Sequence, residues 1–139
     1  NWLIPSLMDC LSKSKHVPYP QRIFEQGLVT VKKESQPIDY ERLAVALCDI
    51  DADFTRIKQV LDVLLSSVGV EYSSKETEHG SFISGRVARI SVKNKELAYI
   101  GELHPQVLEN WGIEMPVAVL ELNLTELLEA IKDRERKSE

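Results

Sequence analysis

The sequence has few cysteines, few aromatic residues and no long apolar run, and each shortage argues against a class of protein. Its two cysteines, Cys10 and Cys48, stand far apart among apolar residues without a Cys-x-x-Cys pair, which argues against a disulfide-stabilised secreted domain. No apolar stretch approaches the ~20 residues of a membrane-spanning helix, and no cationic start is followed by an apolar signal region. We therefore expect a cytoplasmic protein in a reducing compartment, with no membrane partner.

A basic surplus is missing as well. The chain carries 17 Lys and Arg against 22 Asp and Glu, which gives a net charge of -5. An acidic protein repels a phosphate backbone at long range, so broad, nonspecific binding of nucleic acid is disfavoured. Any contact with RNA must be local.

Length and apolar content suit one folded domain. The 139 residues, 43% of them hydrophobic, can bury roughly two-thirds of the surface of the unfolded chain in a single core. We expect one domain over residues 1–139. Because the chain opens with Asn1 and not methionine, and its first residues are already patterned, we also expect that it was excised from a longer polypeptide.

Helical spacing of apolar residues predicts two helices in the first half of the chain. The first covers residues 3–11, where Pro5 suits a first helical turn. The second covers residues 54–68, with Asp53 as its N-cap and Gly69 at the left-handed position that follows a helix.

Two more helices are predicted in the second half. His104-Pro105 opens a short helix that ends near Gly112. The segment from Asn123 to Glu126 resembles a capping box, so a last helix begins there with Leu124, Leu127, Leu128 and Ile131 facing inward. Residues 133–139 are expected to form a frayed, solvated C-terminal tail.

The remaining apolar segments predict strands. Residues 22–32 form a strand with a bend or bulge at Gly27, and residues 40–50 form a central strand covered on both faces. A short strand follows at 70–73, then a polar loop at 74–81, and a hairpin of 86–93 and 96–102 turns around Asn94-Lys95. The last strand covers 116–122. Runs of strands with few parallel crossover units indicate an α+β fold, with a mainly antiparallel sheet flanked by helices.

Three strings of residues carry a family resemblance. The first runs from Leu3-Ile4-Pro5-Ser6-Leu7 to Pro20-Gln21-Arg22-Ile23-Phe24-Glu25-Gln26-Gly27, the second is Phe82-x-x-Gly85-Arg86-Val87-Ala88, and the third is Ile100-Gly101-Glu102-Leu103-His104-Pro105-Gln106-Val107-Leu108. Their order and spacing, with Trp111-Gly112-Ile113 and the segment 116–122 after them, resemble the C-terminal class II synthetase-like module of phenylalanyl-tRNA synthetase beta subunits of the archaeal and eukaryotic type. The resemblance covers nearly the whole chain.

This resemblance implies a fold like the class II aminoacyl-tRNA synthetase catalytic domain, without its active site. It implies a subunit that pairs with a catalytic alpha subunit, in a heterotetramer of two alpha and two beta subunits, to attach phenylalanine to tRNA(Phe). In that family the alpha subunit holds ATP and phenylalanine, and ATP and magnesium are implied as cofactors of the holoenzyme. We expect neither cofactor in this domain, and we expect it to be inactive alone.

The sequence supports the expectation of an inactive domain, because it lacks the motifs that activation of an amino acid requires. Class II activation needs arginines that neutralise the ATP phosphates and lie near the purine. The chain has no Gly-x-Gly-x-Gly-x-Glu-Arg string, and Arg22-Ile23-Phe24-Glu25 matches the Phe-Arg-x-Glu string of these enzymes only superficially, with the wrong spacing. A structural role for Arg22 is therefore favoured over phosphate binding.

Two rival functions remain open. A stand-alone metal-dependent enzyme could use His79, Glu102 and His104, since imidazole and carboxylate both bind zinc. The alternative for these residues is structural: His104 caps the helix opened by Pro105, and Glu102 receives a hydrogen bond or ion pair, for which Arg86 is a candidate. The second rival is a protein-interaction module unrelated to synthetases.

No catalytic, cofactor-binding or metal-binding residue is therefore assigned. The motif positions are expected to be structural or to lie in an interface: Arg22, Phe24, Glu25, Gly27, Gly85, Arg86, Gly101, Glu102, His104 and Pro105.

Overall fold

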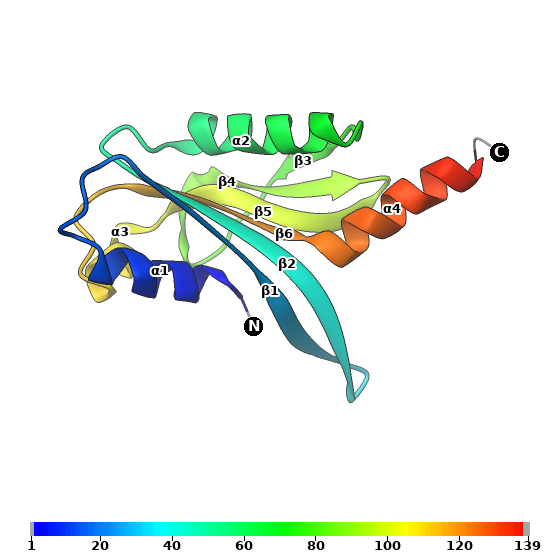
Figure 1. The fold of residues 1–139 in the computed structure, drawn as a ribbon, viewed down its shortest axis with the longest axis horizontal. Helices are drawn as coiled ribbons and strands as arrows, with labels where there is room; N and C mark the ends of the chain where they lie inside the picture. Colours follow the sequence, from blue (N-terminus) through cyan, green and yellow to red (C-terminus); the bar gives the residue numbers. More distant parts are fainter. Residues whose placement is uncertain (1, 138–139) are drawn as a thin grey trace.

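The protein folds as a sheet with helices on both faces (Figure 1). A computed structural model describes residues 2–137. In that range the elements, in chain order, are α1 (Ile4–Lys13), β1 (Gln21–Lys33), β2 (Gln36–Cys48), α2 (Phe54–Ser67), β3 (Ser73–Glu76), β4 (Phe82–Val92), β5 (Lys95–Leu103), α3 (Pro105–Asn110), β6 (Val117–Asn123) and α4 (Leu124–Lys137).

The sheet has six strands in the order β1-β2-β6-β5-β4-β3, and every neighbouring pair is antiparallel. Figure 1 shows α2 and α4 on one side of the sheet and α1 and α3 on the other, while the β1–β2 hairpin extends beyond the helices. The predicted α+β class with an antiparallel sheet is confirmed.

Each face of the sheet carries its own apolar core. One core packs beneath α1 and includes Leu7, Met8 and Val119. The other packs beneath α2 and includes Ile57, Leu61 and Leu120. The central strand β6 serves both cores, and all seven of its residues are buried.

The predicted caps are confirmed because they depend on residues that are close in sequence. The Asp53 carboxylate accepts the N–H of Arg56 at 2.9 Å, and Gly69 has a φ of +70°. At the start of α4, the side-chain oxygen of Asn123 accepts the N–H of Glu126 at 3.0 Å.

Several strand predictions were wrong in detail. The pairing of β1 with β2 runs without a break through Gly27, so of the predicted bend or bulge, the bulge is not there. A Cβ at this position would lie 3.5 Å from Cδ2 of Leu3, an ordinary van der Waals contact, so close packing does not require glycine there. The short strand predicted at 70–73 is β3, which occupies Ser73–Glu76 within the predicted polar loop and is exposed along its length.

The two hairpin turns also differ from the prediction. The turn between β4 and β5 is made by Lys93 and Asn94, both with positive φ, one position before the expected pair. The long β1–β2 hairpin has its tip at residues 33–36, whose side chains are all polar. The polar sequence does not predict a hairpin at this place. β2 therefore starts earlier than expected, at Gln36. Within the sheet it lies beside the edge strand β1, and the central strands are β6 and β5.

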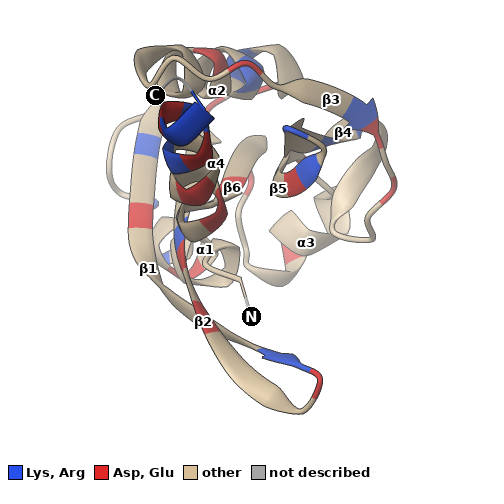
Figure 2. Cartoon of the chain, turned by 90° about the vertical axis from the view of Figure 1, so that its right-hand side faces the viewer, with Lys and Arg blue, Asp and Glu red and all other residues tan. Residues whose placement is uncertain are grey.

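The last helix is longer and less buried than predicted. It continues through Lys137, so the predicted frayed tail is helical from Asp133 to that residue; residues 138–139 lie outside the described residues. Leu128, expected to face inward, is 53% exposed. Figure 2 shows acidic and basic residues along α4. Within residues 2–137, no helix is both long and apolar enough to span a bilayer.

Candidate functional site

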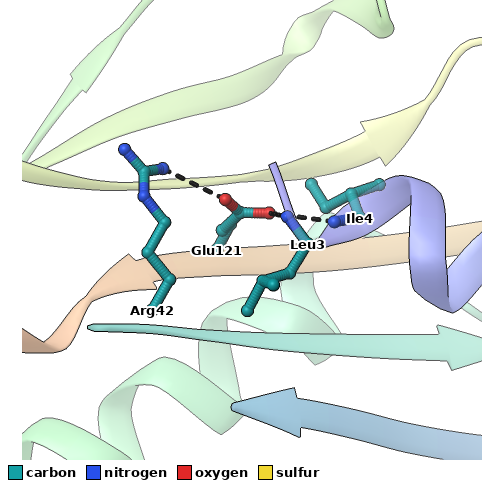
Figure 3. A network of polar contacts seen from close by, with 4 residues as sticks. All are labelled: Leu3, Ile4, Arg42 and Glu121. Atoms are coloured by element: carbon teal, nitrogen blue, oxygen red, sulfur yellow. Dashed lines mark hydrogen bonds and ion pairs between the residues drawn. The ribbon is translucent and has the colours of Figure 1, made fainter. Parts of the chain in front are cut away.

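A buried carboxylate at the centre of the sheet attaches the first helix to the strands. Glu121 lies in β6, paired with Ala44 of β2 and Tyr99 of β5, and it is 2% exposed. One carboxylate oxygen accepts the N–H groups of Leu3 at 2.8 Å and Ile4 at 3.0 Å (Figure 3). These are backbone donors at the start of α1 that would otherwise have no intrahelical acceptor. Glu121 therefore holds α1 against the sheet.

The other carboxylate oxygen of Glu121 receives an arginine. Nη1 of Arg42, on the adjacent strand β2, donates to it at 3.0 Å. The Arg42 side chain is 21% exposed, its Nε is buried without a hydrogen-bond partner, and its guanidinium lies 5.9 Å from the centre of the Trp2 ring. The pair joins β2, β6 and the segment that leads into α1.

Burial dominates the electrostatics of this carboxylate. It raises the pKa of Glu121, while the N–H groups of Ile4 and Leu3 and the Arg42 guanidinium act in the opposite direction. All three partners stabilise the ionised form, and the net shift remains upward. Both carboxylate oxygens thus have hydrogen-bond partners within the fold, which gives Glu121 a structural role.

The first motif places its residues on alternating faces of β1. Arg22 and Phe24 point to the face that carries α2, since they pair with Leu47 and Val45, which contact the core beneath α2; both are exposed. Glu25 and Gly27 alternate onto the face that carries α1. Arg22 and Glu25 thus cannot meet over one substrate on a shared face.

The second motif shapes the backbone of β4. Gly85 has a φ of +80°, inside a register shift between Phe82 and Val87. Gly101 of β5 is needed for close approach: a Cβ there would lie 2.7 Å from the carbonyl oxygen of Arg86 and 2.7 Å from Cδ1 of Phe82. Both glycines serve the irregular pairing of β4 with β5.

Glu102 and His104 make the contacts expected of structural residues. The Glu102 carboxylate accepts from Nη1 of Arg86 at 3.1 Å and from the N–H of Phe54, the first residue of α2, at 3.2 Å. Nδ1 of His104 accepts the N–H of Gln106 at 3.1 Å, and Pro105 is the first residue of α3. The predicted Arg86–Glu102 pair and the predicted cap by His104 are confirmed.

His79 lies on the other side of the sheet from Glu102. Its ring packs against those of Trp2, Phe82 and Tyr99 at centroid distances of 5.3, 5.3 and 5.5 Å, on the face that carries α1. It borders a mainly apolar pocket of about 340 Å³ between α1 and α3. His79 and His104 both line a second pocket, but Glu102 points to α2 on the opposite face, so the three residues of the metal-enzyme hypothesis do not converge. Within residues 2–137, no group of three or more His, Cys, Asp or Glu side chains could hold a metal ion.

Cys48 is not an activated nucleophile. Burial, followed by the nearby charge of Asp49, raises the pKa of the Cys48 thiol to about 11, so its thiolate is scarce at neutral pH. Cys10 is exposed, and neither forms a disulfide.

Sequence reasoning missed the role of Glu121. One signal was available: a carboxylate stands inside the apolar run Val117–Leu122, where an unpaired charge would be very costly. Its partners could not be found in this way, because Leu3 lies 118 positions away.

Comparison with known proteins gives consistent matches. The model of the family described as phenylalanyl tRNA synthetase beta chain CLM domain matches residues 1–124. The phenylalanine–tRNA ligase beta subunits of Pyrococcus abyssi and Thermococcus onnurineus are 54% and 51% identical over 129 residues, and that of Thermofilum pendens is 40% identical over 126. The chain aligns over 91%, 91% and 88% of its own length and spans only 23% of each relative.

Two solved structures of pyrrolysyl-tRNA synthetase from Desulfitobacterium hafniense share the fold. Their TM-scores are 0.70 and 0.74, at 23% and 20% sequence identity. In both cases the match covers 91% of this chain and 47% of the other. At such low identity, the likeness concerns the fold alone.

Proposed function

Since this chain belongs to the phenylalanyl-tRNA synthetase beta chain family, we propose that it is a noncatalytic scaffold domain of the ligase. In this proposal it supports the alpha–beta assembly that attaches phenylalanine to tRNA(Phe) at the expense of ATP. The observation that carries the proposal is the filled centre of the sheet: β6 is buried at every residue, and its one carboxylate is bound to α1 and Arg42.

The residues on the sheet do not fit ATP. Adenylate formation needs preorganised positive charge where pyrophosphate leaves. Three arginines of the sheet are already paired with carboxylates, namely Arg42, Arg86 and Arg89. Arg22 is exposed on the edge strand, on the face opposite α1. On the side of the sheet under α1, the described strands therefore offer a nucleotide no arginine that is free of a carboxylate partner.

We therefore assign catalysis and the binding of its substrates to a partner subunit. The relatives are named beta subunits, which implies an alpha subunit, and we place ATP, magnesium and phenylalanine there. We propose a cytoplasmic heterotetramer of two alpha and two beta subunits that binds tRNA(Phe) as a whole. The net charge of -5 leaves local contact, rather than a broad basic surface, as the way in which this domain could touch tRNA.

Two assays test the proposal. Phenylalanine-dependent exchange of pyrophosphate with ATP by this chain alone is expected to be absent, and its detection would overturn the noncatalytic assignment. Because an inactive fragment could simply be misfolded, the second assay uses the assembled complex. Single-turnover adenylate formation with Arg22→Ala or His104→Ala in this domain should match that of the wild type. A loss of about 10²-fold without dissociation, as expected for a missing general acid or base, would assign chemistry to the domain.

A further inference from the structure

One apolar area of the sheet is only partly covered by the described residues. We call it the open sheet face and define it by five side chains: Phe24 and Leu28 of β1, and Leu43, Val45 and Leu47 of β2. The unbroken register of β1 with β2 places all five on the side of the sheet that carries α2. Phe24 is 75% exposed and Leu28 is 66% exposed. Large apolar side chains that gather on one surface commonly mark a site of contact.

The open sheet face lies beside the helical layer, not beneath it. α2 packs over β5 and β6, and α4 packs against β2. Val63 of α2, 71% exposed, lines a groove of about 800 Å³ together with Leu47. Leu128, 53% exposed, is one turn beyond Thr125, whose hydroxyl accepts the N–H of Glu41 on β2. Leu128 therefore lies near this strip of sheet, and the groove lined by Val63 and Leu47 borders it.

These features determine what kind of element fits. From Arg22 to Leu28, β1 spans about 20 Å at ~3.3 Å per residue, which a helix covers with about 13 residues at ~1.5 Å each. Such a helix would lie in the layer of α2 and α4 and would need an apolar side toward Phe24 and Val63. Between Phe24 and Leu28 on this face lies the uncharged Gln26, whereas the exposed Arg22 lies at one end and the exposed Glu41, opposite Leu28, at the other. A covering helix therefore needs polar or oppositely charged groups at its ends, so that no unpaired ion is buried.

We propose that an amphipathic helix of the same polypeptide, from outside residues 1–139, covers the open sheet face in the complete protein. The chain spans only 23% of its curated relatives, and the matched fold is only 47% of the pyrrolysyl-tRNA synthetase chains. Proteins of both groups thus carry much sequence beyond the matched region. A segment tethered to the domain has a high effective concentration and does not lose the translational freedom that a separate partner must lose.

The test is thiol labelling of the product of the complete gene. Phe24→Cys is compared with Lys75→Cys, an exposed position on β3 at the opposite edge of the sheet. Maleimide labelling of each position is followed by peptide mass spectrometry, so that other cysteines do not interfere, and each rate is normalised to that in urea. In the subunit without its alpha partner, Phe24→Cys is expected to react at least ten times more slowly than Lys75→Cys. Leu28→Cys repeats the measurement if Phe24→Cys does not fold.

Three results would overturn the proposal: equal labelling rates at both positions, protection that appears only when the alpha subunit is added, or a gene that encodes only these 139 residues. The second result would show that the open sheet face contacts the other subunit. The proposal rests on family membership and not on the noncatalytic assignment. Labelling does not measure catalysis, and pyrophosphate exchange does not measure burial of Phe24, so the two proposals can fail separately.

Discussion

Removing the Glu121 carboxylate should loosen the first helix from the sheet. Glu121→Ala leaves the Arg42 guanidinium without its partner and leaves the N–H groups of Leu3 and Ile4 without an acceptor. Deleting one member of a buried ion pair typically costs about 3–5 kcal/mol, which is a large part of a total stability of roughly 5–15 kcal/mol. For a domain of this size, we expect a fall of about 10–20 °C in Tm.

The assay combines urea denaturation with hydrogen exchange. In the wild type, the amide protons of Leu3 and Ile4 should be protected from exchange, and in Glu121→Ala they should exchange much faster, while amides in β6 keep part of their protection. The double variant Arg42→Met, Glu121→Leu is the control, because replacing both members of a buried pair by apolar residues is often close to neutral. Its loss should be well below the sum of the two single losses. A loss below about 1 kcal/mol for Glu121→Ala, with protection at Leu3 unchanged, would refute the role assigned to the carboxylate.

The same residue gives a pH dependence of defined sign. Because burial raises the pKa of Glu121 in the folded state, the folded protein binds this proton more tightly than the unfolded chain does. The stability from this group is then complete below the unfolded pKa of about 4.3 and is lost as the pH rises through the folded pKa. The stability of the wild type minus that of Glu121→Gln should therefore fall as the pH rises above about 4. A rise in this difference with pH would show that Arg42 and the backbone N–H groups outweigh burial.

Three further substitutions test the packing and the caps. Leu61→Ala, at a fully buried site in α2, should cost about 2–5 kcal/mol in urea denaturation; the exposed Val63→Ala is the control, and equal losses would contradict the assigned helix face. Gly101→Ala should destabilise by about 1–3 kcal/mol, since its Cβ would lie 2.7 Å from a backbone oxygen, whereas Gly80→Ala meets nothing within 4 Å; similar melting curves for the two would count against this close approach. His104→Ala should cost about 0.5–2 kcal/mol, and an unchanged Tm would show that the cap at α3 contributes nothing.

The open sheet face explains why Leu128 of α4 departed from its predicted burial and why Phe24 of β1 is exposed. Helical spacing groups Leu128 with Leu124 and Leu127, and strand alternation groups Phe24 with Leu28. Both patterns are real, because each set lies on one side of its element. Burial also requires a neighbour on that side. For Leu128 and Phe24, none of the elements described between residues 2 and 137 supplies full cover.

The sequence of residues 1–139 by itself determines most local features of the fold, namely the helix caps and the positions of the strands. Caps at Asp53, His104 and Asn123 join groups two or three positions apart, so any chain with these residues can form them before tertiary contacts exist. Alternation of apolar and polar residues likewise places strands, because it depends only on the direction of successive side chains.

The tertiary structure alone decided which strands are neighbours and which charges meet. β6, the penultimate element in sequence, pairs between β2 and β5, and this order brings Glu121 to Leu3 across 118 positions. It also separates Glu102 from His79, which a sequence argument could draw into one site. The physical reason is that pairing of distant strands is set by the burial of both faces of the whole sheet, a free energy to which every element contributes and which no short window of sequence contains.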